Sequence, residues 1–198
     1  MTTMTAVCVF CGSGMGNSPA YRDHAERLGR ALAERGLALV YGGGNVGLMG
    51  AIADAALEAG GTVRGYIPRA LMEKEVAHRS LTDLAVLGSM HERKAAMETN
   101  ADGFIALPGG FGTLDELCEI LTWAQLGIHR KPVGMLDVDG YFEPLLGFFD
   151  KAVEHGFIRS EHRSLLLADT DPAALLDRMA AWRSTIVPKW TTVPAPVP

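Results

Sequence analysis

The stretch "ALPGGFGTLDELCEIL", residues 106–121, joins the end of an apolar strand, three glycines and the start of a helix. A glycine-rich turn in that position presents unpaired backbone amides and the positive end of the helix dipole, so it attracts anions. Glu116 places a carboxylate beside this anion site. Two interpretations stay open: Thr113 and Glu116 form a capping box at the helix start, or Glu116 faces a bound sugar phosphate and stabilises a developing cation.

The rest of the chain alternates short apolar runs with helical patterns. The expected strands are 6–13, 37–44, 62–68, 83–89, 103–110, 131–137 and 164–170. The expected helices are 19–34, 47–60, 90–100, one after 110, 141–155 and one from 172. This alternation predicts an α/β fold, with a single doubly wound, mostly parallel sheet of the modified Rossmann type and helices on both faces. We expect one nucleotide-binding domain over residues 1–185, followed by a proline-rich tail over 186–198.

Composition excludes several functions. The chain has 198 residues, 48% of them apolar, and a net charge of -5. It shows no basic stripe of the kind that nucleic-acid binding requires. No apolar run is long enough to cross a bilayer, and the N-terminus lacks the pattern of a cleaved signal peptide. We therefore expect a cytoplasmic protein without a nucleic-acid or membrane partner.

Cysteine and histidine patterns do not favour a metal. Cys8 and Cys11 form a C-x-x-C pair, but they lie on an expected strand, where side chains three residues apart point to opposite faces. Buried thiols are therefore favoured over a redox pair or a zinc site. The six histidines show no metal-ligand spacing,. We predict no metal and no cofactor.

Three glycine turns follow strands: 12–14, 42–44 and 109–112. In a parallel sheet such turns share one edge, where ligands bind. They predict one crevice lined with backbone amides, and a phosphate or nucleotide within it. Residues 42–47 match G-x-G-x-x-G, but the next strand, 62–68, ends without the acid that a dinucleotide site requires, so NAD is not favoured. No Walker A sequence is present.

The segment "SMHERKAAMETN", residues 89–100, supplies a basic complement. Met90, Arg93, Lys94 and Met97 follow helical spacing and share a face. In one interpretation the methionines pack in the core and the charges are solvated. In the other, Arg93 and Lys94 lie near the crevice and bind a phosphate, a carboxylate or a purine nitrogen. Ser13 lacks the context of a nucleophile and is expected to hydrogen-bond a phosphate or ribose.

With these motifs, the chain resembles the Lonely Guy family of cytokinin riboside 5'-monophosphate phosphoribohydrolases over about residues 5–180. The signature PGGxGTxxE stands intact at 108–116, with matching blocks at 8–14, 41–50 and 90–94. The resemblance implies hydrolysis of the N-glycosidic bond of a nucleoside 5'-monophosphate to a free base and ribose 5-phosphate. It also implies Arg93 and Glu116 as the catalytic pair, and a homodimer with the site near the interface, where Glu75 acts across subunits. The implied substrate-binding residues are Ser13, Gly43, Gly44, Glu75, Met90, Arg93, Lys94, Gly109, Gly110, Phe111, Gly112, Thr113, Leu114, Asp115, Glu116 and Thr122.

Two alternatives remain. Carriers of the molybdenum cofactor share this fold and a similar glycine motif, and amide nests bind phosphate without a catalyst. A pure carrier, however, needs neither Arg93 nor Glu116. The second alternative is a broad purine nucleotide nucleosidase, which the sequence does not separate from an enzyme specific for cytokinin nucleotides.

Overall fold

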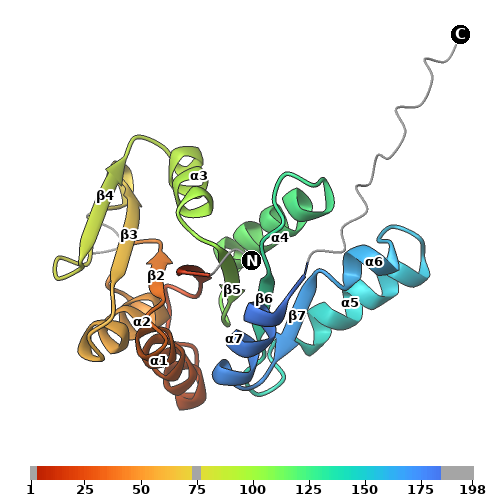
Figure 1. The fold of residues 1–198 in the computed structure, drawn as a ribbon, viewed down its shortest axis with the longest axis horizontal. Coiled ribbons are helices and arrows are strands. Elements are labelled where there is room, and N and C mark those ends of the chain that lie inside the picture. The colour runs from red at the N-terminus through yellow and green to blue at the C-terminus, as the bar shows by residue number, and fades with distance from the viewer. Residues whose placement is uncertain (1–3, 73–76, 184–198) are drawn as a thin grey trace, which may run out of the picture.

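The computed structural model describes residues 4–72 and 77–183. Its seven strands form one sheet in the order β4-β3-β2-β1-β5-β6-β7, and every neighbouring pair is parallel (Figure 1). The predicted α/β sheet is therefore confirmed. The strands are β1 (Ala6–Phe10), β2 (Ala38–Tyr41), β3 (Val63–Pro68), β4 (Asp83–Leu87), β5 (Gly103–Ala106), β6 (Val133–Leu136) and β7 (Leu166–Asp169).

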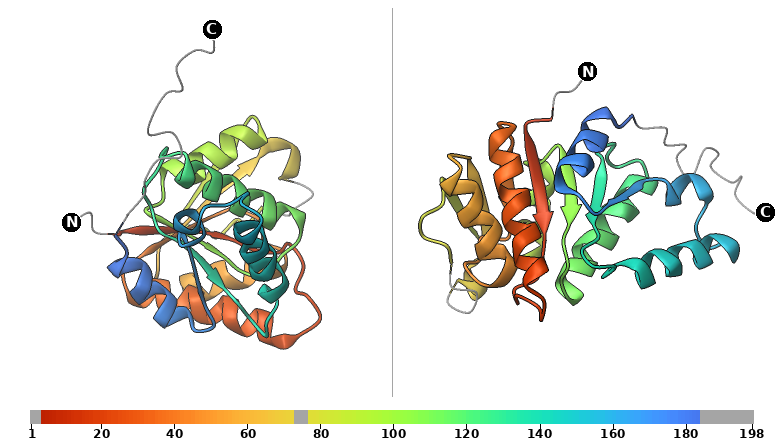
Figure 2. Two further views of the ribbon diagram at one scale, coloured as in Figure 1. Left: turned by 90° about the vertical axis from the view of Figure 1, so that its right-hand side faces the viewer. Right: turned by 90° about the horizontal axis from the view of Figure 1, so that it is seen from below.

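Helices cover both faces of the sheet (Figure 2). One apolar core joins the sheet to α1, α2 and α7, and a second joins it to α3, α4 and α5. The helices are α1 (Pro19–Glu34), α2 (Gly47–Glu58), α3 (Met90–Thr99), α4 (Phe111–Gln125), α5 (Glu143–Glu154), α6 (Ser160–Arg163) and α7 (Pro172–Ala181), with a 3-10 turn, η1 (Arg69–Leu71). The sequence did not predict η1 or α6, which are too short to show a periodic pattern.

Side chains cap the starts of α1 and α7. The Ser18 side chain accepts a hydrogen bond from the amide of Ala20, and Pro19 occupies the first helical position of α1. Asp171 caps α7 by accepting from the amides of Ala173 and Ala174. A side-chain acceptor satisfies amides that the helix itself leaves unpaired.

The two cysteines of the C-x-x-C pair are buried on opposite sides of the sheet. Cys8 packs in the core with α3, α4 and α5, and Cys11 packs in the core with α1, α2 and α7. Burial raises the pKa of both thiols well above the usual value, and the nearby charge of Glu116 raises it further. Both groups therefore stay neutral at physiological pH, which confirms the prediction of buried thiols.

The strand order reverses between β1 and β5. The chain runs outward from β1 through β2, β3 and β4, and then returns to place β5 on the other side of β1. Connections diverge to opposite faces at such a switch point and leave a crevice beyond the carboxyl ends of the strands. The turns at 12–14 and 109–112 lie at this point.

Among the described residues, no helix is long and apolar enough to cross a membrane.

Candidate active site

A cavity of about 210 Å³ opens at the switch point, between the ends of β1 and β2 and the start of α4. All three glycine turns contribute to its wall, but the turns 12–14 and 109–112 also line a second, adjoining cavity of about 350 Å³, so the glycines do not form the predicted single crevice. We call the first of these two cavities the glycine cavity. Its lining residues are Val9, Phe10, Cys11, Gly12, Ser13, Gly42, Met49, Arg93, Gly110, Phe111, Gly112, Thr113 and Glu116.

The first turn of α4 supplies unpaired amides to this cavity. The helix begins at Phe111 with Gly110 as its N-cap, and no side chain caps it. Within the described part of the chain, the amides from Gly110 to Thr113 find no acceptor. Thr113 therefore lies inside the helix rather than at its cap, and the capping-box interpretation of Thr113 and Glu116 is wrong. The free amides are available to an anion.

The physical reason for a glycine differs among positions 109, 110 and 112 of the turn. A Cβ on Gly109 would lie 2.1 Å from Oγ1 of Thr113, so this glycine is required by packing within the fold. A Cβ on Gly110 or Gly112 would meet nothing within 4 Å, and neither residue has a positive φ. Packing within the protein therefore does not require glycine at position 110 or 112. Close approach of a ligand to the backbone would require it.

Arg93 and Glu116 face each other across the cavity. Nη2 of Arg93 lies 3.9 Å from Oε1 of Glu116, which is an ion-pair distance but too long for a hydrogen bond,. Arg93 is 7% exposed, and its Nε has no hydrogen-bond partner among the described residues. A buried cation with an unused donor is costly unless a ligand completes its contacts. The structure therefore brings the two predicted catalytic residues together at a polar site.

Gly42 makes room for Arg93. A Cβ on Gly42 would lie 1.9 Å from Nη2 of Arg93, so only glycine admits the guanidinium at its observed place. Gly43 and Gly44 do not line the cavity. Gly43 adopts a φ of 75° and accepts a hydrogen bond from the amide of His78, and Gly44 forms a β-bridge with Ala77. These two glycines shape the turn that carries Gly42.

Lys94 is engaged outside the glycine cavity. Its Nζ lies 3.1 Å from Oδ2 of Asp115 and 3.1 Å from Oε2 of Glu119. Partial burial favours a lower pKa for Lys94, but the hydrogen bonds that its ammonium donates to the two carboxylates outweigh this effect and raise the pKa. The charged amine ties α3 to α4 and so holds Arg93 opposite Glu116. Leu114 packs against the core beneath α4.

The remaining predicted site residues lie apart from the cavity or outside the described chain. Met90 is exposed and contacts Arg93, with Nη1 3.6 Å from Sδ, whereas Met97 is buried in the core. Thr122 donates a hydrogen bond to the carbonyl of Cys118 and lines a different hollow, beside α5 and α6. Glu75 lies outside the described residues. Ser13, in contrast, lines the glycine cavity, and its hydrogen bond to a phosphate or ribose stays a prediction.

The turns 12–14 and 42–44 were predicted to line the crevice, but the implied substrate-binding residues did not include the lining residues Val9, Phe10, Cys11, Gly12, Gly42 and Met49. Gly12 and Gly42 are the first glycines after β1 and β2, so their position directly at a strand end was the available signal. Met49 lies in the first turn of α2, and its sequence context gives no such signal. In the described part of the chain, no group of three histidine, cysteine, aspartate or glutamate side chains is arranged to hold a metal ion.

Comparison with known proteins connects this geometry to a family. A family model described as "Possible lysine decarboxylase" matches residues 49–179. A rice protein named probable cytokinin riboside 5'-monophosphate phosphoribohydrolase LOGL1 is 51% identical over 173 residues, which cover 87% of this chain and 78% of that protein. The Arabidopsis thaliana protein named cytokinin riboside 5'-monophosphate phosphoribohydrolase LOG5 is 50% identical over 177 residues, covering 89% and 78% of the two chains. The chain belongs to the LOG phosphoribohydrolase family. Its signature at 108–116 forms one wall of the glycine cavity.

Solved structures of other proteins share the fold of this chain. The molybdenum cofactor binding protein of Rippkaea orientalis superposes with a TM-score of 0.68 at 23% identity, over 91% of this chain and 98% of that one. The molybdenum cofactor carrier protein of Chlamydomonas reinhardtii gives 0.67 at 22% identity, over 90% and 99%. At such identities the likeness shows a shared fold only. Among the described residues that line the glycine cavity there is no lysine, the side chain that holds the cofactor of a pyridoxal-phosphate decarboxylase,.

Proposed function

We propose that this protein hydrolyses the N-glycosidic bond of a nucleoside 5'-monophosphate, with cytokinin nucleotides as the substrate class. The observation that carries the proposal is the pairing of free amides at the start of α4 with Arg93 and Glu116 in one cavity. The amides suit the phosphate, and the carboxylate suits the sugar. Relatives at about half identity, named for this activity, support the assignment.

The reaction places positive charge on the ribose. Water adds its oxygen to the anomeric carbon, the carbon–nitrogen bond breaks, and the electron pair and a proton end on the base. The ribose acquires oxocarbenium character in the transition state, as in glycoside hydrolysis. The carboxylate of Glu116 stabilises that charge and is placed to activate the water or to form a transient bond.

Arg93 has a different role, because a guanidinium stays ionised and does not donate its proton. Its unused Nε and its fork of donors orient the ribose, the base or Glu116 itself,. The phosphate anchors the substrate in the amides of α4. Binding energy from this remote group supports the reaction at the sugar, so a nucleoside without phosphate should react poorly.

The activity assay is direct. Purified protein is incubated with AMP and with isopentenyladenosine monophosphate, and release of the base is followed by chromatography. We expect base and ribose 5-phosphate in equal amounts. Higher kcat/KM for the prenylated nucleotide supports a cytokinin substrate, equal values support the broad nucleosidase, and tight retention of a ligand without turnover supports a carrier.

Gly112→Ala isolates the ligand site from the fold. The added Cβ meets no protein atom within 4 Å, so the melting temperature should stay unchanged. The methyl group occupies space that we assign to the phosphate, so AMP affinity by calorimetry should fall at least about tenfold, the loss of one or two charge-assisted hydrogen bonds. Gly147→Ala, on α5, is the matched control, since its Cβ also meets nothing. Unchanged AMP affinity in Gly112→Ala would argue against phosphate at this turn.

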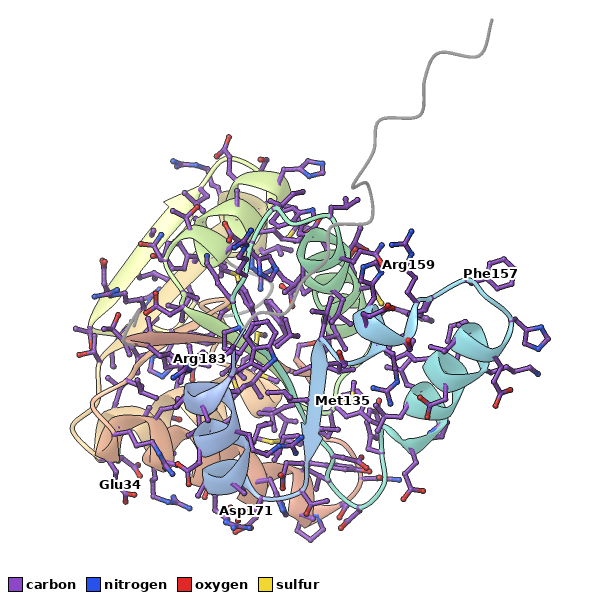
Figure 3. The ribbon with its side chains drawn as sticks, turned by 45° about the vertical axis from the view of Figure 1, so that its right-hand side comes forward. Glu34, Met135, Phe157, Arg159, Asp171 and Arg183 are labelled. Atoms are coloured by element: carbon purple, nitrogen blue, oxygen red, sulfur yellow. The ribbon has the colours of Figure 1, made fainter. Side chains whose placement is uncertain are left out.

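We also propose a homodimer with the site near its interface. The cavity is smaller than the roughly 300–1,000 Å³ usual for a small-molecule site,. Phe111, at its rim, is 94% exposed, and Phe157, which projects from the segment between α5 and α6, is 85% exposed (Figure 3). Large exposed aromatic side chains are typical of interaction surfaces. The family resemblance also implies that Glu75 acts across subunits. Light scattering at micromolar concentration measures the mass; a monomer contradicts the proposal.

A cytoplasmic location is part of the same proposal. The three cysteines are free thiols, and Cys118 is exposed. Free exposed thiols suit a reducing compartment.

A further inference from the structure

Tyr141 contacts the phosphate-binding turn from outside the glycine cavity. Its hydroxyl donates a hydrogen bond to the carbonyl of Gly109, with an oxygen–oxygen distance of 2.6 Å, across 32 positions in the sequence. We propose that Tyr141 is a positioning residue: it holds the peptide between Gly109 and Gly110 so that the Gly110 amide faces the ligand. The inference rests on the phosphate site of the proposed function.

Three consecutive carbonyls of the turn are each held by a donor. The amide of Gly12 donates to the carbonyl of Pro108 at 3.0 Å, and the amide of Leu114 donates to that of Gly110 at 3.1 Å. Both donors belong to the backbone, on β1's turn and on α4. The middle carbonyl, that of Gly109, is held by the side chain of Tyr141. A substitution can therefore release this one peptide without altering the other two.

Peptide geometry connects the carbonyl to the amide. In a trans peptide the C=O and N–H bonds point in opposite directions. Tyr141 and Gly109 line a neighbouring cavity of about 350 Å³ and not the glycine cavity, whereas Gly110 lines both cavities. Drawing the Gly109 carbonyl toward Tyr141 therefore turns the Gly110 amide toward the glycine cavity. Glycine on both sides of this peptide leaves its plane free to rotate, so an external hydrogen bond is needed to hold it.

Tyr141 is itself held in place. It follows a tight turn in which Asp139 and Gly140 have φ angles of 53° and 71°, and its amide donates to the carbonyl of Val138 at 3.0 Å. Its ring packs edge-on against Tyr21 and Phe142, with centroid distances of 5.8 and 5.0 Å. A ring fixed in this way presents its hydroxyl with little loss of conformational entropy.

Tyr141→Phe removes the hydroxyl and keeps the ring. Calorimetry with AMP and with adenosine, in a Glu116→Gln background that prevents turnover, separates the phosphate from the rest of the ligand. We expect the Kd for AMP to rise about tenfold, the scale of one hydrogen bond, and the Kd for adenosine to stay the same. Tyr21→Phe is the matched control, because it removes a hydroxyl from the adjoining ring, and it should change neither Kd.

The ligand-free protein gives a second readout. In Tyr141→Phe the backbone amide resonance of Gly110 should shift or broaden, since its peptide is released, while Tyr21→Phe leaves it unchanged. Equal weakening of AMP and adenosine, unchanged AMP affinity, or an unchanged Gly110 resonance would each overturn the assignment. If the parent protein does not bind AMP, the proposed function fails, and the Gly110 resonance still decides whether Tyr141 holds the peptide.

Discussion

Glu116→Gln should lower kcat for base release by about 10³-fold and also lower the melting temperature, because the buried guanidinium of Arg93 loses its counter-charge,. Glutamine has the shape of glutamate but lacks the charge that stabilises the cationic ribose, and removal of one electrostatic stabiliser costs up to about this much. Because the two side chains have the same shape, the substitution creates no cavity at this mostly buried position, which is 14% exposed. The measurement is base release from a nucleoside 5'-monophosphate at saturating substrate, with differential scanning calorimetry for stability.

The control for this variant lies one turn along α4. Glu119→Gln makes the same chemical change, and Glu119 pairs with Lys94 rather than facing the glycine cavity. Asp115 still pairs with Lys94 in this variant and keeps α3 tied to α4, so we expect activity close to that of the parent protein. Full activity in Glu116→Gln, or an equal loss in both variants, would show that Glu116 takes no part in the chemistry. The carrier interpretation would then be favoured over the enzyme.

Arg93→Lys should lower kcat/KM by about 10²-fold. Lysine keeps the positive charge but loses the planar fork of donors, and its ammonium reaches less far, so the groups it orients move out of line. Arg22→Lys is the control, because Arg22 lies on the exposed face of α1. Steady-state kinetics of the two variants make the comparison. Parent-like kinetics in Arg93→Lys would mean that a point charge is sufficient and that the fork orients nothing.

Gly42→Ala tests the position of Arg93 without changing Arg93 itself. The new Cβ would lie 1.9 Å from Nη2, so the guanidinium must leave its place. The loss of kcat/KM should therefore resemble that of Arg93→Lys. Gly147→Ala on α5, which meets no atom, is expected to behave like the parent protein. Activity retained in Gly42→Ala would show that the observed place of Arg93 is not the one that matters.

The sequence predicted the sheet well because parallel strands buried on both faces read as short continuous apolar runs. The turn at 109–112 was predictable because its glycines directly follow an apolar strand pattern and directly precede a helical pattern, so the signal lies in neighbouring residues. Boundaries were less predictable. Thr113 and Glu116 match the spacing of a capping box, yet α4 starts at Phe111, because Gly110 serves as N-cap without a side-chain bond.

What the sequence could not predict depends on contacts between distant segments. The need for glycine at 42 arises from Arg93, which lies on another element. The hydrogen bond from Tyr141 to Gly109 depends on how the connection after β6 folds back over the start of α4. Lys94 follows the same helical spacing as Arg93, but only the structure shows that its charge is held by Asp115 and Glu119. A local sequence pattern does not show which distant residues will be in contact.

A crystal structure of Glu116→Gln with a bound nucleoside 5'-monophosphate tests the central claim most directly. We expect phosphate oxygens at about 3 Å from the amides of Gly110 to Thr113, with the anomeric carbon of the ribose facing residue 116. A phosphate lodged away from the start of α4, with the ribose out of reach of residue 116, would contradict it.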